Sequence, residues 1–287
     1  MSLKDVVDLI LALFRFGRAQ SNPVRKQAAR ILQAFEVHGI ACTQINPLLP
    51  EHLRLPAIAW SNADELKTAL TQAHIEWISH FFALEPEWLA GVSDEANEQV
   101  FSYKSPAELH CWFEEHKAPE QALEFKLHLI TADEGAITPR SSGYFAVVLE
   151  QFIENGNNYQ SRLYQLSAGA HFDHYPCLLH LMQILAMAHF HGAIMDRSRL
   201  APSELAQLSK NEGLIAGWLN RCKPHRLEAD HEFWGHFSGS SHWLEQLRQD
   251  AEQSLLMAGL NSVVEKVRQD RKRFARPQSA TTNHPIT

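Results

Sequence analysis

A change in hydrophobic periodicity near residue 122 most constrains how this chain can fold. Before it, apolar residues recur at three- and four-residue spacing, as in segment 24–38, which is typical of amphipathic helices. After it, Phe125, Leu127 and Leu129 alternate with neighbours in the manner of a strand. We therefore expect a mainly α chain with a C-terminal α+β domain.

The N-terminal part contains several helix signals. An amphipathic helix is expected over 3–16, and Ser21-Asn22-Pro23 is typical of the start of a second helix that runs to about His38. One or two further helices are expected over 61–83, and a short one before Gly91. Residues 46–60 contain Pro47, Pro50 and Pro56, which exclude a long helix from that stretch.

The C-terminal part predicts a small antiparallel sheet packed by helices. Strands are expected over 125–130, 144–153 and 159–166, and Glu154-Asn155-Gly156-Asn157-Asn158 favours a hairpin between the last two because Asn and Gly accept positive φ. Helices are expected over 176–191, from Pro202, over 213–222 and over 241–275. The helix over 176–191 is apolar on almost every side, which predicts burial.

These segments suggest five parts. They are an N-terminal amphipathic helix (1–20), a helical domain (21–92), a linker with a helix (93–122), an α+β domain for sensing or association (123–276) and a disordered tail (277–287).

Composition limits the classes of protein to which this chain can belong. The four cysteines are far apart with no C-x-x-C pair, which suits reduced thiols, and no apolar run reaches the ~20 residues of a membrane span. Asp5 and Asp8 also argue against a secretory signal, so a cytoplasmic protein without a membrane partner is expected. The net charge is −7, but residues 1–35 carry +4 and residues 266–276 carry +5, so local phosphate contacts remain open.

Two stretches carry a resemblance to a known family. The first is the helix from Ala28 followed by His38-Gly39-Ile40-Ala41-Cys42-Thr43-Gln44-Ile45, and the second is Phe81-Phe82-Ala83-Leu84-Glu85-Pro86-Glu87-Trp88-Leu89-Ala90-Gly91. On these stretches, residues 24–91 resemble the Cro/lambda-repressor type of helix-turn-helix domain. The resemblance implies a helical DNA-binding domain, which in this family usually acts as a dimer on paired half-sites.

The resemblance also implies which residues would contact DNA. Thr43 and Gln44 stand where the family makes backbone or base contacts, and Arg54 is a basic residue in the region of the family's reading helix. Arg25, Lys26 and Arg30 on the preceding helix are candidates for phosphate contacts, with an ordinary solvated helix face as the alternative. The sequence departs from the family in the proline-rich segment 46–60, where the reading helix should be.

Other features of the sequence are also candidates for sites. His171, Asp173 and His174, with His225, His231, His236 and His242 downstream, invite a metal hypothesis, but their spacing matches no known module, so no metal and no cofactor is assigned. Ser238-Gly239-Ser240-Ser241 is more simply a helix cap, and no catalytic residue is assigned. A basic cluster ends the last helix, and a ligand pocket between the sheet and helix 176–191 is an alternative to plain core packing.

The sequence thus predicts a two-domain DNA-binding transcriptional regulator, dimeric and not an enzyme, with a C-terminal domain that senses a ligand or self-associates. The ligand is not identified. A protein-interaction module on a helix-turn-helix scaffold that no longer reads DNA is the alternative. A metal-dependent enzyme using the histidine-rich C-terminal half is a third.

Overall fold

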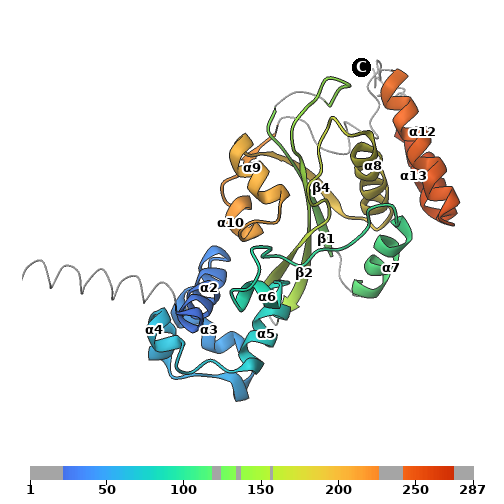
Figure 1. The fold of residues 1–287 in the computed structure, drawn as a ribbon. Helices are drawn as coiled ribbons and strands as arrows, with labels where there is room; N and C mark the ends of the chain where they lie inside the picture. The colour runs from blue at the N-terminus through green and yellow to red at the C-terminus, as the bar shows by residue number, and fades with distance from the viewer. Residues whose placement is uncertain (1–21, 118–123, 134–136, 156–157, 226–241, 275–287) are drawn as a thin grey trace, which may run out of the picture. The chain divides into compact units, whose positions relative to one another are not determined.

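The computed structural model describes residues 22–117, 124–133, 137–155, 158–225 and 242–274. It is a mixed helix and sheet fold with one five-stranded sheet (Figure 1). The described residues form two compact units: unit 1 comprises those up to Glu98 together with Asn211–Asn220, and unit 2 comprises Gln99–Lys210 and those from Arg221 onward. The boundary expected at residue 122 falls within unit 2.

Unit 1 is helical. Its elements are α2 (Pro23–Val37), α3 (Cys42–Leu48), the 3-10 turns η1 (Glu51–Leu53) and η2 (Ala57–Ser61), α4 (Ala63–Leu66), α5 (Gln72–Phe82), α6 (Pro86–Leu89) and α10 (Ile215–Leu219). The expected start of α2 is confirmed: the Asn22 side chain accepts hydrogen bonds from the backbone N–H groups of Val24 and Arg25, and Pro23 occupies the first turn.

The proline-rich segment of unit 1 is held by hydrogen bonds from the side chains of Asn46 and of His74, which lies 2.9 Å from the Leu53 carbonyl. No α-helix lies between Leu49 and Asn62, as the prolines predict. Asn46 donates to the Leu55 carbonyl at 2.6 Å and accepts from the Leu55 N–H at 3.2 Å and from the Trp60 indole N–H at 3.0 Å. Asn46 therefore supplies backbone hydrogen bonds that a helix would have supplied itself.

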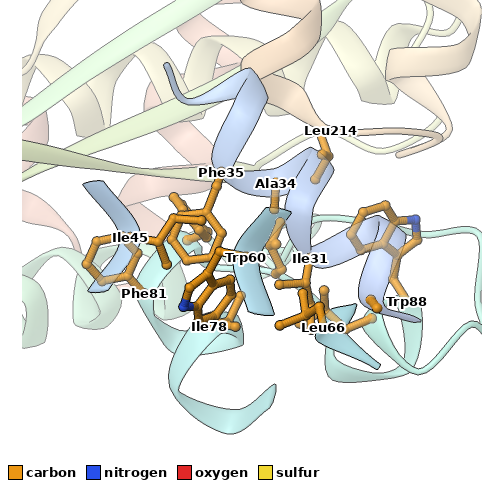
Figure 2. Close-up of a cluster of buried hydrophobic side chains, with 14 of the residues drawn as sticks. Ile31, Ala34, Phe35, Ile45, Trp60, Leu66, Ile78, Phe81, Trp88 and Leu214 are labelled. Atoms are coloured by element: carbon orange, nitrogen blue, oxygen red, sulfur yellow. The ribbon is translucent and has the colours of Figure 1, made fainter. Parts of the chain in front are cut away.

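The core of unit 1 is built around aromatic side chains (Figure 2). The Phe35 ring meets Trp60 edge-on at a centroid distance of 5.8 Å and Phe82 at 5.0 Å, an arrangement that aromatic pairs favour. Leu214, which follows the last residue of α9 by five positions along the chain, is buried in the same cluster. The segment 211–220 is thus part of this core.

Unit 2 contains the sheet, whose strand order is β3-β2-β1-β4-β5. The strands are β1 (Phe125–Thr131), β2 (Ala146–Asn155), β3 (Asn158–Gln165), β4 (Ile194–Arg199) and β5 (Lys223–Pro224). The expected antiparallel hairpin is confirmed, because β2 and β3 pair in that sense from Val148–Gln165 to Asn155–Asn158.

The prediction of a purely antiparallel sheet is wrong, because β1 and β4 are parallel and the sheet is mixed. A parallel neighbour requires a crossover, and α8 (Tyr175–Phe190) precedes β4 directly. The sequence Ile194-Met195-Asp196-Arg197-Ser198-Arg199 was not assigned as a strand because it has only two apolar residues. Pairing with β1 overrides this weak local signal.

Helices cover the sheet of unit 2. Figure 1 shows α8 along the sheet, and α12 (His242–Met257) and α13 (Asn261–Phe274) pack against α8. Two more helices are α7 (Pro106–His116), against α8, and α9 (Pro202–Ser209), against β2. The single helix expected over 241–275 is divided at Gly259, whose φ is +79°. In the described part of the chain, no helix is both long and apolar enough to cross a bilayer.

Some expectations fall outside the described residues. These are the amphipathic helix over 3–16, the tail 277–287, the histidines His231 and His236, and the serine-rich segment 238–241.

Candidate functional site

Two of the predicted DNA contacts, Arg25 and Arg30, have partners within unit 1. The Arg25 guanidinium lies 3.2 Å from an Asp64 carboxylate oxygen. Arg30 donates to the carbonyls of Trp88 and Ser93, and its guanidinium lies 4.8 Å from the centre of the Trp88 ring. Only 12% of the Arg30 side chain is exposed, and this burial lowers its pKa. Arg30 therefore anchors α6 against α2.

The other four predicted DNA contacts, Lys26, Thr43, Gln44 and Arg54, are exposed. The Gln44 side chain accepts a hydrogen bond from the Ala41 N–H at 2.9 Å and so caps α3. Arg54 follows the η1 turn and does not lie on a described helix. It is therefore not part of an element that could enter a DNA groove as a reading helix. Lys26 lies four residues before Arg30 on α2, whereas Thr43 and Gln44 lie on α3 and Arg54 follows η1.

The charge of unit 1 also bears on DNA binding. Its described residues include five Lys or Arg against eleven Asp or Glu, which gives a net charge of −6. Affinity for duplex DNA depends largely on neutralising phosphates with basic side chains. The described surface of unit 1 is therefore electrostatically unfavourable for DNA.

Of the histidines considered for metal binding, those within the described residues form no group spaced for a metal ion. His171 pairs with Asp173 at 3.1 Å, while His174 is an exposed residue at the start of α8. Among the described residues, the one group of three side chains spaced for a metal ion is His110, Glu114 and His191. None of these three was singled out from the sequence.

A cavity of about 290 Å³ lies in unit 2 between the end of the sheet and α8. The alternative to core packing is a pocket between the sheet and helix 176–191, and this cavity adjoins that helix at Cys177 and His180. Three segments form its wall: the chain that enters unit 2, the end of β3 with the turn after it, and the first turns of α8. The lining residues are Gln99, Val100, Phe101, Ser102, Tyr103, Gln165, Leu166, Ser167, Ala168, Gly169, Ala170, Cys177 and His180.

Backbone pairing positions the first two segments of this wall. Gln99 forms an isolated parallel bridge with Gln165, and the Val100 N–H donates to the Gln165 carbonyl at 3.1 Å. The chain then turns at Gly169, whose φ of +69° favours glycine. The cavity is therefore framed by hydrogen-bonded backbone on one side and a buried helix on the other.

The lining contains no Asp, Glu, Lys or Arg, and its histidine is neutral. His180 is 5% exposed, and burial lowers its pKa to about 4. Its Nε2 atom lies 2.7 Å from the Ser102 hydroxyl, and the Tyr103 ring meets it edge-on at 5.4 Å. The cavity therefore presents apolar groups and uncharged hydrogen-bonding groups.

Gln165 is the unusual residue of the cavity wall. Its side chain is 1% exposed, yet neither its amide oxygen nor its amide nitrogen has a hydrogen-bond partner. Gln151, the other buried glutamine at the sheet, donates to the His116 carbonyl at 3.1 Å and accepts from the Tyr164 hydroxyl at 3.2 Å. Buried polar groups in proteins are nearly always hydrogen-bonded, so an unpaired amide on a residue of the cavity wall makes this cavity the candidate site.

Sequence reasoning named the strand that carries Gln165 but not its role. The signal in the sequence is weak: Gln165 is the last polar residue of the strand expected over 159–166, and His180 is a polar residue within the apolar helix α8. The sequence by itself does not show that these two residues and Ser102 share one cavity.

Comparison with known proteins adds no further constraint on this site. No protein-family model matches the chain, and no curated protein and no solved structure is significantly similar to it.

Proposed function

We propose that this chain is a regulatory protein whose C-terminal unit senses a small uncharged ligand in the cavity beside α8. The observation that carries the proposal is the buried, unpaired amide of Gln165 in the cavity wall. An unmade hydrogen bond to a buried donor or acceptor is worth about 1–3 kcal/mol. A ligand in the cavity recovers this energy when the Gln165 side chain turns toward it and both amide atoms pair with it.

The size of the cavity limits the ligand. Its volume of about 290 Å³ equals the liquid volume of about ten water molecules and is at the lower end of the range for small-molecule sites. This favours a compact molecule with on the order of ten non-hydrogen atoms. Larger cofactors such as dinucleotides do not fit this volume.

The lining limits the chemistry of the ligand. A buried charge without a counter-charge is strongly unfavourable, and the lining offers no charged group. Gln165 offers one acceptor and one donor side by side, which complements a neighbouring donor and acceptor in the ligand. Primary amides, lactams and nucleobases have this pattern, and an apolar ring would pack on Val100 and Leu166.

Binding is better supported than catalysis at this cavity. Ser102 and His180 form a hydroxyl–imidazole pair, but no carboxylate among the described residues hydrogen-bonds His180 to orient it. A histidine whose pKa is about 4 is also a weak base at neutral pH. The pair is therefore suited to fixing a ligand by hydrogen bonds.

The first test replaces Gln165 by Met, which keeps the shape of the side chain and removes the amide. We expect the free energy of unfolding to rise by about 1 kcal/mol, because an unpaired amide no longer has to be buried. Binding of benzamide is expected to weaken about 10-fold, because two hydrogen bonds are lost. Denaturant unfolding and ligand-observed NMR measure these two effects.

Gln151→Met is the matched control. It removes an amide that is paired, so stability should fall while benzamide binding changes little. Benzoate and ethylbenzene should bind the wild-type chain more weakly than benzamide, since one is charged and the other cannot pair with Gln165. Equal loss of stability in both glutamine variants would contradict the proposal.

For the N-terminal unit, we propose a role in binding a protein partner rather than in reading duplex DNA. The resemblance to the helix-turn-helix family supports a regulatory role, and the charge and contacts of unit 1 support the protein-binding alternative. Arg25 and Arg30 serve contacts within the unit, and acidic residues outnumber basic ones. We also propose that the protein forms a homodimer.

A second test measures binding of the full chain to duplex DNA at low salt. We expect affinity no higher than that of an acidic control protein, since the described surface of unit 1 has few free basic groups. Lys26→Glu with Arg54→Glu changes two exposed positions without disturbing the Arg30 contacts. Salt-dependent binding in the wild type that this double variant reduces would favour DNA instead.

A further inference from the structure

A cluster of three side chains lies where the second half of α7, from its middle onward, meets the C-terminus of α8, three turns along α8 from the cavity. His110 and Glu114 are four residues apart on α7 and so share one face of that helix, and His191 caps the C-terminus of α8. One nitrogen from each histidine and one oxygen from the glutamate all lie within 4.8 Å of one another. The cluster belongs to no part of the proposed ligand cavity.

We propose that His110, Glu114 and His191 form a site for a divalent transition-metal ion such as zinc. Two imidazoles and one carboxylate are the donor set of many such sites, in which a water molecule completes the coordination. Calcium and magnesium are disfavoured because they require mainly oxygen ligands.

The distances fit this ion. His110 Nδ1 and His191 Nε2 are 3.1 Å apart, and two nitrogen ligands at zinc–nitrogen distances of 2.0–2.1 Å are about 3.3 Å apart in a tetrahedral site. Glu114 has a half-exposed side chain that is free to turn its carboxylate toward the two nitrogens. The site is therefore nearly assembled and open on the Glu114 side.

The surroundings hold His191 in place. Its side chain is fully buried, and its ring stacks on Phe113 at a centroid distance of 4.5 Å. Its Nδ1 atom lies 3.4 Å from a Glu114 oxygen but makes no well-formed hydrogen bond. Burial and stacking therefore fix the ring with its Nε2 atom toward His110 Nδ1.

The helix ends favour a positive charge at this place. The last carbonyl groups of a helix carry a partial negative charge, and both α7 and α8 end beside the cluster. The competing group is Lys117, whose ammonium lies 3.3 Å from a Glu114 oxygen. A metal ion must displace this ammonium from Glu114, and Lys117 therefore weakens metal binding.

The test uses the full chain without an affinity tag, dialysed against a chelator and then titrated with zinc chloride in competition with a chromophoric chelator. We expect one tightly bound ion per chain. His110→Ala and Glu114→Gln alter side chains that are at least partly exposed, so folding should be retained, and each should weaken zinc binding by about 10-fold or more. Substitution with cobalt should give the visible absorption of a four-coordinate site.

Two further variants sharpen the test. His116→Ala removes a histidine of the same helix that contacts Trp112 instead, and zinc affinity should be unchanged. Lys117→Gln removes the competing ammonium, and zinc affinity should rise. Absence of stoichiometric zinc would overturn the proposal, as would an affinity that His110→Ala and Glu114→Gln leave unchanged, because zinc would then be held by other histidines.

Discussion

Replacing Asn211 by alanine is expected to lower the free energy of unfolding of unit 1 by about 4 kcal/mol. Asn211 and Asn97 are both buried and hydrogen-bond each other in both directions. The Asn211 side-chain oxygen Oδ1 accepts from the Asn97 backbone N–H at 3.2 Å and from the Asn97 side-chain amide at 2.8 Å, while the Asn211 side-chain amide donates to the Asn97 backbone carbonyl at 2.7 Å. Alanine removes all three bonds.

The loss is large because the remaining groups stay buried. The Asn97 N–H and carbonyl would lack partners, at about 1–1.5 kcal/mol each. Asn211 also has a φ of +60°, a conformation that asparagine tolerates better than alanine and that costs alanine about 1 kcal/mol. These contributions together with the lost side-chain bond give the expected magnitude.

Asn211→Gly separates the two causes. Glycine accepts the positive φ but cannot form the side-chain bonds, so it should destabilise unit 1 by about 1 kcal/mol less than alanine does. Amide hydrogen exchange in residues 211–220 measures the effect locally. Exchange that is unchanged in Asn211→Ala would show that the asparagine pair does not hold this segment.

Local sequence signals predicted much of the fold. The start of α2, the absence of a long helix over 46–60, the β2–β3 hairpin and α8 all follow from capping residues, prolines, Asn-Gly turns and apolar runs. Each of these signals acts over a few residues, which is why it can be recognised in the sequence. By contrast, β4 is defined by its pairing with β1, which lies more than sixty residues earlier.

The candidate sites were less predictable for the same reason. His110 and His191 are 81 residues apart in the sequence, and Ser102 and His180 are 78 apart. No local pattern links such pairs, because chain folding alone brings them together. The distinguishing property of Gln165 is that its side-chain amide has no hydrogen-bond partner. Only the folded structure shows this.

The role of Arg30 in anchoring α6 against α2 could not be predicted from the sequence either. A basic residue on a helix next to a helix-turn-helix resemblance favours a phosphate contact, but its carbonyl partners at Trp88 and Ser93 lie about sixty residues away in the sequence. Arginine readily serves such internal roles because its planar group can donate several hydrogen bonds and stack on an aromatic ring. The same side chain cannot also be presented freely to DNA.

Replacing Glu252 by glutamine is expected to lower the free energy of unfolding of unit 2 by about 3 kcal/mol. The Glu252 side chain is 8% exposed, and its two oxygens lie 2.8 Å from the Arg268 guanidinium and 2.9 Å from that of Arg271. This carboxylate on α12 therefore joins two arginines of α13, and both helices pack on α8. When the charge of Glu252 is removed, Arg268 and Arg271 lose their shared counter-charge. The buried Arg248 loses its favourable interaction with the same carboxylate.

Glu245→Gln is the matched control on the same helix. Glu245 pairs with the buried Arg248 at 3.2 Å, but its side chain is 43% exposed and Glu252 remains as a second counter-charge for Arg248, so the change should stay below about 1 kcal/mol. Denaturant unfolding of both variants, together with Arg268→Gln and the double variant, gives the coupling energy between Glu252 and Arg268. A coupling near zero, or equal effects of Glu252→Gln and Glu245→Gln, would mean that burial does not strengthen this ion pair and that apolar packing alone holds α13 on α8.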